Sequence, residues 1–398
     1  MLIRAEISNY KSVAQANLQF STENVIVGPN GVGKSNLLDA LHFVRDAARD
    51  GLDHSITKRH GINSIRRWSK TRPYNLGIKL VFSHGLLYGE YRLSIASAAG
   101  EYSVLEEEGH WKGPDPFRGA QRNADSVSAS FKRHQDGIVE FNLPQNPFTS
   151  GSERSTVTDT DLLLTQFGQS AFGPGPLYFR ALYQQITSFG AYSIYPNKIR
   201  EPQTISNLEV LADDGTNLAS IIRQMRSTSY RSNRETLTSA IKQVLPIVNE
   251  IRIESAGGFY VPVFRVKEVD TGYSHDLNMS QLSDGTLRML GMLTAFYQPR
   301  APVRITMEEP EQMIHPGLLP VLLDSARDYL ESGAGARQTF FTTHSPGLLD
   351  MFEPDSIIGA TFEDGVSKFA PISRRQLGII KDRLFSAGEL LVAEGIFN

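Results

Sequence analysis

The segment GPNGVGKS, residues 28–35, matches the phosphate-loop pattern G-x-x-x-x-G-K-[ST] at every fixed position. The glycines let consecutive backbone N–H groups curve around an anion, and a helix that follows directs its positive end to the same anion. In such a loop Lys34 reaches the outer phosphates of a nucleotide, and the hydroxyl of Ser35 ligates Mg²⁺. The segment therefore predicts a nucleotide-binding turn. The competing interpretation is a glycine-rich strand-to-helix turn that binds nothing.

The residues on both sides of this loop have the pattern that it requires. Val25–Val27 is a short apolar strand candidate directly before the loop. After Lys34 the apolar side chains recur at the spacing of a helix with one buried face, at Leu37, Leu38, Leu41 and Val44. Further strand candidates are the short apolar segments 3–7, 14–20, 76–82, 87–94, 102–107 and 127–141. From residue 247 strands alternate with helices, so we expect an α/β fold with a parallel or mixed sheet.

The composition is that of an ordinary globular protein with ample core. The chain has 398 residues, 40% hydrophobic and 21% charged, a length typical of two or three domains. The absence of cysteine excludes a disulfide scaffold, a Cys-ligated zinc site, an iron–sulfur cluster and a cysteine nucleophile. The net charge of −3 predicts no overall attraction to nucleic acid, so such a contact needs a local basic patch. No apolar run is long enough to span a bilayer and residues 1–12 lack a signal-peptide core, so we expect a cytoplasmic protein without a membrane partner.

The pattern divides the chain into three segments. Residues 1–160 hold the phosphate loop and most strand candidates, and residues 247–398 hold the later strands and helices. Between them, residues 161–246 are predicted to form a helical insertion, with candidate helices at 161–172, 177–189, 217–225 and 234–245. Two polar stretches, 112–125 and 147–160, predict a loop and a mobile connection.

Two carboxylates follow a mostly apolar strand candidate at 303–307. Glu308 can hold Mg²⁺, directly or through water, and Glu309 can polarise a water that attacks a γ-phosphate. The competing interpretation is an exposed acidic loop. Within the strand, Arg304 and Thr306 interrupt the apolar run expected of a strand buried on both faces. Either one face of this strand is partly open, or these two side chains have buried partners.

Two helix starts complete the set of motifs. Ser283 and Asp284 are good N-cap residues before the apolar helix 287–296, and with Gly285 they can also form an anion receptor. In TTHSP, residues 342–346, Ser345 and Pro346 predict the start of a helix, which leaves His344 in the loop after a strand. An ordinary helix start and a structural histidine are the competing interpretations.

Taken in order, these motifs resemble the ABC-type ATPase heads of the SMC, RecF and OLD-nuclease group, and most closely the compact stand-alone AAA-family ATPases of bacteria. The segments that carry the resemblance are ISNYKSV (7–13), GPNGVGKSN (28–36), LADDGTNLA (211–219), QLSDGTLR (281–288), EEPEQMIHP (308–316) and TTHSP (342–346), with weaker matches in GINSIRRWS (61–69) and YPNKIREP (195–202). The resemblance implies a P-loop NTPase fold, a two-lobed head with a mixed central sheet. A short helical insertion stands in place of the group's coiled coil.

The resemblance also implies that ATP is sandwiched between two subunits of a head-to-tail homodimer. One subunit would hold the triphosphate through Asn30, Gly31, Val32, Gly33, Lys34, Ser35 and Asn36, with Lys11 and Ser12 near the nucleotide. The other would cap the γ-phosphate through Ser283, Asp284 and Gly285. Ser35 and Glu308 would serve Mg²⁺, Glu309 would activate water, and His344 would be the γ-phosphate switch.

The sequence departs from the group's pattern at two points. Glu308 stands where Asp is usual, which keeps the charge and the ligand type but changes the reach of the side chain. No Gln follows the strands near Phe82, where related heads carry a glutamine that contacts the metal and water. We therefore expect ATP binding with slow or partner-stimulated hydrolysis.

Two functions are compatible with these motifs. The first is an ATPase whose closure acts on DNA or on a DNA-processing partner, in DNA repair or phage defence. Basic clusters available for DNA, each also compatible with a solvated face, are Arg66, Arg67, Lys70 and Arg72, and then Arg223, Arg226, Arg231 and Arg234. The second is an ATP-gated switch that controls an effector nuclease, which we expect on a separate chain because no nuclease motif is evident. A membrane-transporter ATPase is disfavoured by the long segment between Ser35 and Ser283 and by the SDG signature.

Overall fold

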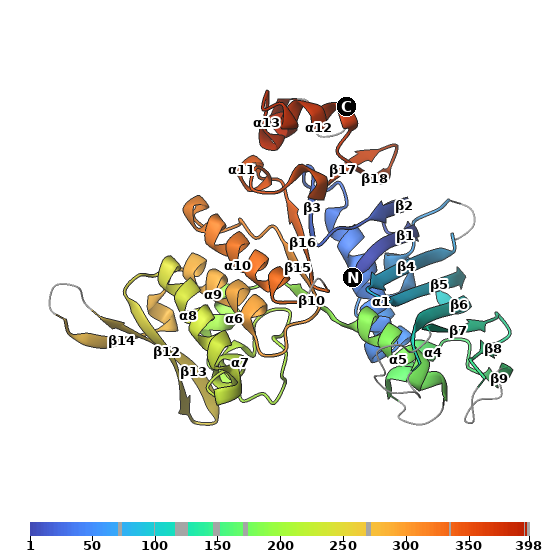
Figure 1. Ribbon diagram of the computed structural model, residues 1–398, viewed down its shortest axis with the longest axis horizontal. Coiled ribbons are helices and arrows are strands. Elements are labelled where there is room, and N and C mark those ends of the chain that lie inside the picture. Colours follow the sequence, from blue (N-terminus) through green and yellow to red (C-terminus); the bar gives the residue numbers. More distant parts are fainter. Residues whose placement is uncertain are drawn as a thin grey trace. The chain divides into compact units, whose positions relative to one another are not determined.

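The computed structural model describes residues 1–70, 74–98, 100–115, 126–145, 152–169, 174–267, 272–333, 336–393 and 395. Its elements are labelled in Figure 1. The chain forms two compact units, the first from Met1–Phe189 and Asp355–Arg374, the second from Gly190–Pro354 and Arg375–Gly395. The division into three segments at residues 160 and 246 stays a prediction.

The first unit is built on one mixed sheet. Its strands, in spatial order, are β3 (Glu23–Val27), β17 (Ile357–Glu363), β18 (Val366–Pro371), β2 (Val13–Gln19), β1 (Leu2–Tyr10), β4 (Leu76–His84), β5 (Leu87–Ala98), β6 (Glu101–Pro114), β7 (Ser126–Arg133), β8 (Ile138–Asn142) and β9 (Ser152–Thr156). β3 pairs with β17 and β18 with β2 in parallel, whereas the strands from β2 to β9 pair antiparallel. The expected mixed sheet is confirmed.

The longest helix of the first unit, residues 34–50, is buried on most sides, because every residue from Ala40 to Ala48 is buried, whereas the sequence predicted one buried face. The helices of this unit are α1 (Lys34–Asp50), α2 (Leu52–Thr57), α3 (Ile62–Ile65), α4 (Leu163–Gln169) and α5 (Pro174–Thr187). The α1 residues expected to be buried are at most 1% exposed, and α5 packs against α1. A buried carboxylate ties the sheet to α4, because Glu107 of β6 accepts hydrogen bonds from the backbone N–H groups of Leu163 and Leu164 at 2.8 and 3.0 Å. These contacts satisfy two of the donors that every helix start leaves unpaired.

The second unit combines a parallel strand pair with an antiparallel sheet. β15 (Arg304–Glu308) pairs in parallel with β16 (Gln338–Thr343), and β10 (Phe189–Tyr192) lies next to β15. The antiparallel sheet has β13 (Phe259–Lys267) paired with β11 (Gln203–Thr204), β12 (Val248–Ala256) and β14 (Ser274–Asn278). The helices are α6 (Pro196–Arg200), α7 (Leu218–Gln224), α8 (Arg231–Val244), α9 (Asp284–Tyr297), α10 (Leu319–Glu331), α11 (Pro346–Leu349), α12 (Arg374–Lys381, beginning at the unit boundary) and α13 (Ala387–Ala393).

The structure corrects several sequence predictions. Residues 152–156 form β9 although they were expected in a mobile connection, because β9 is held by backbone pairing with β8 and needs no apolar side chains. Residues 127–141 are two strands joined at 134–137, and the strands after residue 247 pair antiparallel until β15. Most of the loop predicted at 112–125 lies outside the described residues, while 112–114 belong to β6.

The polar side chains of β15 have buried partners, which resolves the alternatives left by the sequence. Arg304 is fully buried, and its Nε donates to Oε1 of Gln338 on β16 at 3.1 Å. Burial lowers the pKa of Arg304 to about 9. Thr306 donates to the carbonyl of Gly190 at 3.2 Å. β15 is therefore buried on both faces, and its two polar side chains are hydrogen-bonded inside.

Within the described residues α1, with 17 residues, is the longest helix. A long coiled coil is thus absent from the described part of the chain, as expected. In the same part, no helix combines the length and the apolar character that crossing a membrane requires.

Candidate functional site

The phosphate loop of the first unit connects β3 to α1 in a strongly curved path. Gly31 has φ +82° and Gly33, the N-cap of α1, has φ +99°, both in the region that favours glycine. A Cβ at Gly33 would lie 2.1 Å from Oγ of Ser367 and 2.8 Å from Oγ of Ser12. A Cβ at Gly28 would lie 2.3 Å from the carbonyl oxygen of Ala360. Glycine is therefore required at 28 and 33, and we call this curved loop, residues 28–35, the cradle.

Lys34 is the cation of this loop. The side chain is 5% exposed, and Nζ donates to the carbonyl oxygens of Gly28 and Pro29 at 2.7 and 3.1 Å. The ammonium of Lys34 is thus bound to the carbonyl groups of its own loop, next to the N-terminus of α1. Phosphate oxygens are anionic and accept hydrogen bonds more strongly than carbonyls, so a nucleotide can take these donors over.

The residues predicted to lie near the nucleotide surround the start of α1. Asn36 donates to Oγ of Ser12 at 2.7 Å, and Ser12 shares a 2.6 Å hydrogen bond with Ser367. Lys11 forms an ion pair with Asp39 of α1 at 2.7 Å. Burial raises the pKa of Asp39, but Arg59, Lys11 and a hydrogen bond from Tyr10 outweigh it, and the net shift is downward. Ser12 and Asn36 therefore buttress the cradle directly, whereas Lys11 acts on α1 through Asp39.

Glu309 and His344 lie together in the second unit. Glu309 follows β15 with φ +44°, and its N–H donates to the carbonyl of Thr342 on β16 at 2.9 Å. Its Oε1 lies 3.5 Å from Nδ1 of His344, and its Oε2 accepts a hydrogen bond from Gln312. A left-handed backbone at Glu costs about 1–3 kcal/mol and persists only where its surroundings hold it. The backbone of Glu309 and its contacts with Gln312 and His344 therefore hold its carboxylate beside the exposed His344.

The signature segment lies at the start of α9 in the same unit. Oγ of Ser283 accepts a hydrogen bond from N–H of Thr286 at 3.1 Å, which confirms the predicted N-cap. Arg200 of α6 forms an ion pair with Asp284 at 2.5 Å. A Cβ at Gly285 would lie 2.7 Å from the carbonyl oxygen of Met313, so glycine is needed for the close approach of the loop after Glu309.

Arg288 connects the signature helix to Glu309, and sequence patterns did not single it out. It is 9% exposed, and it donates to the carbonyl oxygens of Glu309 at 3.1 Å and Ile194 at 3.3 Å. Burial lowers the pKa of Arg288, while the carboxylates of Glu311 and Glu309 act in the opposite direction. Its place on the buried face of an otherwise apolar helix was the signal, because a buried arginine needs specific acceptors.

We expect Arg288→Ala to reduce kcat for ATP hydrolysis by ~10–10²-fold, the effect of misplacing a catalytic group by about 1 Å. The affinity for ATP should stay unchanged, since Arg288 contacts the backbone of Glu309 and not the phosphate loop. Steady-state phosphate release and ATP titration measure the two quantities. Millimolar guanidinium and the variant Arg288→Lys should restore part of kcat. A parallel loss of kcat and ATP affinity, without rescue, would show that Arg288 only supports the fold.

The residues present fit ATP and Mg²⁺. A side chain at Gly33 would collide with Ser367, whereas a Cβ at Gly31 would have no atom within 4 Å, so the loop is open to a ligand there. The buried Lys34 supplies the positive charge. Ser35 is exposed at the first turn of α1, and Glu308 is half-buried at the end of β15. In the described residues no three His, Cys, Asp or Glu side chains form a metal-binding group. Mg²⁺ is commonly bound by one or two protein ligands plus phosphates and waters, so this donor set suits it.

Both units hold part of the predicted set. The first has Lys11, Ser12 and the phosphate loop, and the second has Ser283, Asp284, Gly285, Glu308, Glu309 and His344. Of the first basic cluster, Arg66 donates to Asn63 and Arg67 lies over the ring of Tyr74, while Arg72 lies outside the described residues.

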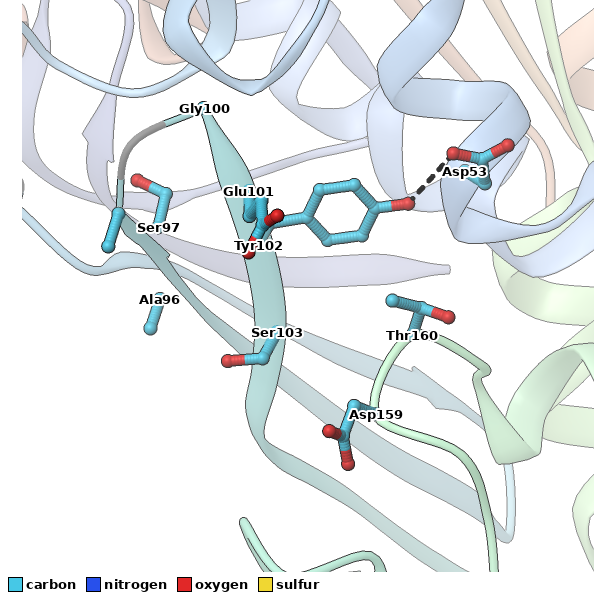
Figure 2. A pocket seen from close by; sticks show the side chains of 10 residues that line it. Asp53, Ala96, Ser97, Gly100, Glu101, Tyr102, Ser103, Asp159 and Thr160 are labelled. Carbon is cyan, nitrogen blue, oxygen red and sulfur yellow. Dashed lines mark hydrogen bonds between the residues drawn. The ribbon is translucent and has the colours of Figure 1, made fainter.

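A cavity of about 720 Å³ in the first unit contains none of the predicted site residues. Figure 2 shows Asp53, Glu101 and Asp159 around it, with the hydroxyl of Tyr102 donating to Asp53 at 3.0 Å. Burial and this hydrogen bond raise the pKa of Tyr102 to about 12. Among the described residues that line the cavity there are three carboxylates and no cation, so these residues repel a triphosphate.

Comparison with known proteins agrees with this geometry. Residues 24–350 match the model of a family described as "AAA domain, putative AbiEii toxin, Type IV TA system". The DNA replication and repair protein RecF of Porphyromonas gingivalis is 59% identical over 39 residues, 10% of this chain and 11% of that protein. RecF of Phocaeicola vulgatus is 49% identical over 45 residues, 11% of this chain and 12% of that protein. The chain thus matches only about a tenth of the length of these relatives.

Among solved structures, the Smc head bound to the C-winged helix domain of ScpA is similar to this chain. The likeness covers 94% of this chain and 99% of that chain, with a TM-score of 0.53 and 14% sequence identity. The similarity shows the fold alone, and it confirms the expected fold of an ABC-type, SMC-like P-loop head.

Proposed function

The chain belongs to this family of AAA domains, and from that premise we propose that it is a Mg²⁺-dependent ATPase that dimerises head to tail around ATP. In the proposed dimer each nucleotide lies between the phosphate loop of one subunit and the signature segment of its partner. ATP-driven closure then acts on DNA or on a DNA-processing partner in the cytoplasm. The similarity to the DNA replication and repair protein RecF supports the link to DNA.

The observation that carries ATP binding is the cradle around Gly33 with the buried ammonium of Lys34. In the proposed mechanism, Lys34 and the backbone N–H groups of the loop bind the outer phosphates. Ser35 and Glu308 would hold Mg²⁺, which neutralises charge on the phosphates when bound. Asn30 and Val32 would complete the loop around the phosphate chain.

The proposed hydrolytic step belongs to Glu309. Its carboxylate accepts a proton from the attacking water, and Gln312 and the 3.5 Å contact to His344 orient it. His344, exposed next to this carboxylate, is the proposed switch that responds to the γ-phosphate. The hydrogen bond from Arg288 to the carbonyl oxygen of Glu309 would hold the backbone of Glu309 while its side chain acts.

The proposed dimer contact is supported by the exposed N-terminus of α9. Ser283 is exposed, and the helix of 14 residues that it caps offers its positive end to an anion. Ser283 and Gly285 would thereby supply the second half of the γ-phosphate site, with Asp284 held aside by Arg200.

The description of the family favours a second candidate. It names an AbiEii toxin of a toxin–antitoxin system, and such a role fits an ATP-gated switch over a separately encoded effector nuclease. Purification from the native host distinguishes the two candidates. A stoichiometric nuclease partner supports the switch, and DNA-stimulated turnover by the isolated protein supports direct action on DNA.

Complementation between two inactive variants tests the shared site. Ser283→Arg should block closure while leaving ATP binding to the single subunit intact, and Lys34→Ala should prevent that binding. A mixed dimer retains one intact site, so an equal mixture should regain up to about a quarter of wild-type turnover by statistical pairing. Light scattering with saturating MgATP should show a dimer for the wild type. A persistent monomer, or no recovery in the mixture, would refute the shared site.

A further inference from the structure

The second unit contains a polar cleft that the proposed ATPase site does not use. Its volume is about 530 Å³, within the range of small-molecule and nucleotide pockets. It lies between α7, the segment before it and the start of β13, and we call it the α7 cleft. The residues that line it are Ile205, Ser206, Asn207, Glu209, Ser220, Arg223, Gln224, Ser227, Tyr230, Tyr260, Pro299 and Arg300.

The wall of the α7 cleft is held in place by side-chain hydrogen bonds. The N–H of Ser206 donates to Oγ of Ser220 at 3.0 Å, and Nε2 of Gln224 donates to the carbonyl of Leu208 at 2.8 Å. Both bonds join the segment 205–210 to α7. A ligand therefore meets a formed cleft and does not have to order these two elements first.

Arg223 makes a flat cationic surface in the cleft. Its guanidinium carbon lies 4.7 Å from the centroid of the Tyr260 ring, a cation–π contact. Such a contact limits the motion of the guanidinium while the exposed side chain remains accessible. Arginine planes and aromatic rings are the surfaces on which unpaired bases stack, and the same guanidinium can also bind phosphate.

The charge around the cleft favours an extended polyanion. Arg300 is paired at 2.5 Å with Glu209, the one carboxylate among the described residues of the lining, and both side chains are more than half exposed. Along the chain, Arg226, Arg231 and Arg234 follow Arg223, and Arg231 pairs with Glu235. Five arginines and two carboxylates leave a surplus of positive charge in a protein whose net charge is −3. Because four of these arginines fall within twelve consecutive residues, the cations suit a chain of phosphates better than a single one.

We propose that the α7 cleft binds single-stranded nucleic acid. One base lies against the Arg223–Tyr260 pair, hydroxyl and amide groups of the lining contact its edges, and arginines contact the flanking phosphates. A cleft of this volume admits an unpaired nucleotide, whereas a duplex keeps its bases stacked inside and presents only its backbone. The proposal deepens the action on DNA proposed above but does not depend on ATP binding.

Fluorescence anisotropy with labelled 20-nucleotide DNA and RNA strands, and with the matching duplexes, tests this assignment. The protein is the full chain carrying Lys34→Ala, so that failure of the ATPase proposal leaves the result readable. We expect strands to bind more tightly than duplexes, with affinity that falls as salt rises. Arg223→Ala and Tyr260→Ala should each weaken strand binding by ~10-fold or more, the effect of losing one stacked base. Tyr260→Phe should retain binding because the ring remains.

Two further variants sharpen the test. Glu209→Gln removes the carboxylate from the lining and should tighten strand binding by a few-fold, which a loss of folding cannot imitate. Arg4→Ala removes a partly exposed arginine on β1 of the other unit and should leave the affinity unchanged. Equal effects of Arg223→Ala and Arg4→Ala, preference for the duplex, or full competition by a free mononucleotide would each overturn the proposal.

Discussion

Replacing Lys34 with alanine should reduce the affinity for ATP by roughly 10²–10⁴-fold, which corresponds to losing two hydrogen bonds between the ammonium and charged phosphate oxygens. Nζ lies over the loop and already bonds to two of its carbonyl oxygens, so no large movement is needed to reach an anion held there. Isothermal titration of MgATP into the purified variant measures the effect. It is one of the two largest changes that we expect from one substitution.

The control for this variant is Lys242→Ala on α8. Lys242 is exposed in the last turn of that helix, so the substitution removes the same charge without touching the phosphate loop. Thermal melting of both variants is also needed, because Lys34→Ala leaves the carbonyl of Gly28 without the donor that Lys34 supplies. Micromolar ATP binding by a folded Lys34→Ala protein, equal to that of Lys242→Ala, would contradict the assignment of the loop.

Glu309→Gln should slow ATP turnover by ~10²–10⁴-fold, the usual contribution of a positioned general base. The substitution keeps the size of the side chain and a hydrogen-bonding group beside His344, but an amide cannot accept the proton of the attacking water. ATP binding should be retained, so the dimer that forms around ATP should accumulate. Single-turnover phosphate release and light scattering measure the two effects.

Glu331→Gln provides the matched control for this second variant. Glu331 is exposed at the end of α10, and its loss of charge should change neither turnover nor assembly. If Glu309→Gln and Glu331→Gln hydrolyse ATP at the same rate, Glu309 is not the base. A slow Glu309→Gln protein that also fails to bind ATP would point to a disturbed fold.

Features written in short stretches of sequence could be predicted. The strand–turn–helix form of residues 23–50 and the caps Ser283 and Ser345 depend on residues within one or two helical turns, and the structure confirms these local elements. Their physical causes, such as a φ above zero or an orphan N–H, act between neighbours in the chain. The same holds for β3 and for the carboxylates at the end of β15.

Features that depend on distant partners could not be predicted. Ser367 contacts Ser12, which lies 355 positions away in the sequence, and no local pattern around either residue predicts this hydrogen bond. Arg288 gains its role only when the chain brings Glu309, 21 positions away, next to it. β9 is polar, and only its partner β8 makes it a strand. In each case the free energy comes from a pairing that local patterns do not encode.

The strands β17 and β18 lie next to the phosphate loop although they come late in the sequence, and this affects the chain while it is being synthesised. β17 pairs with β3, Ala360 lies against Gly28, and Ser367 lies against Gly33, yet these residues are synthesised more than 320 positions after the loop itself. A ribosome that has released only the first 350 residues therefore presents a loop without its supporting strand. The loop therefore gains these contacts only after residue 367 has been synthesised, long after its own residues have left the ribosome.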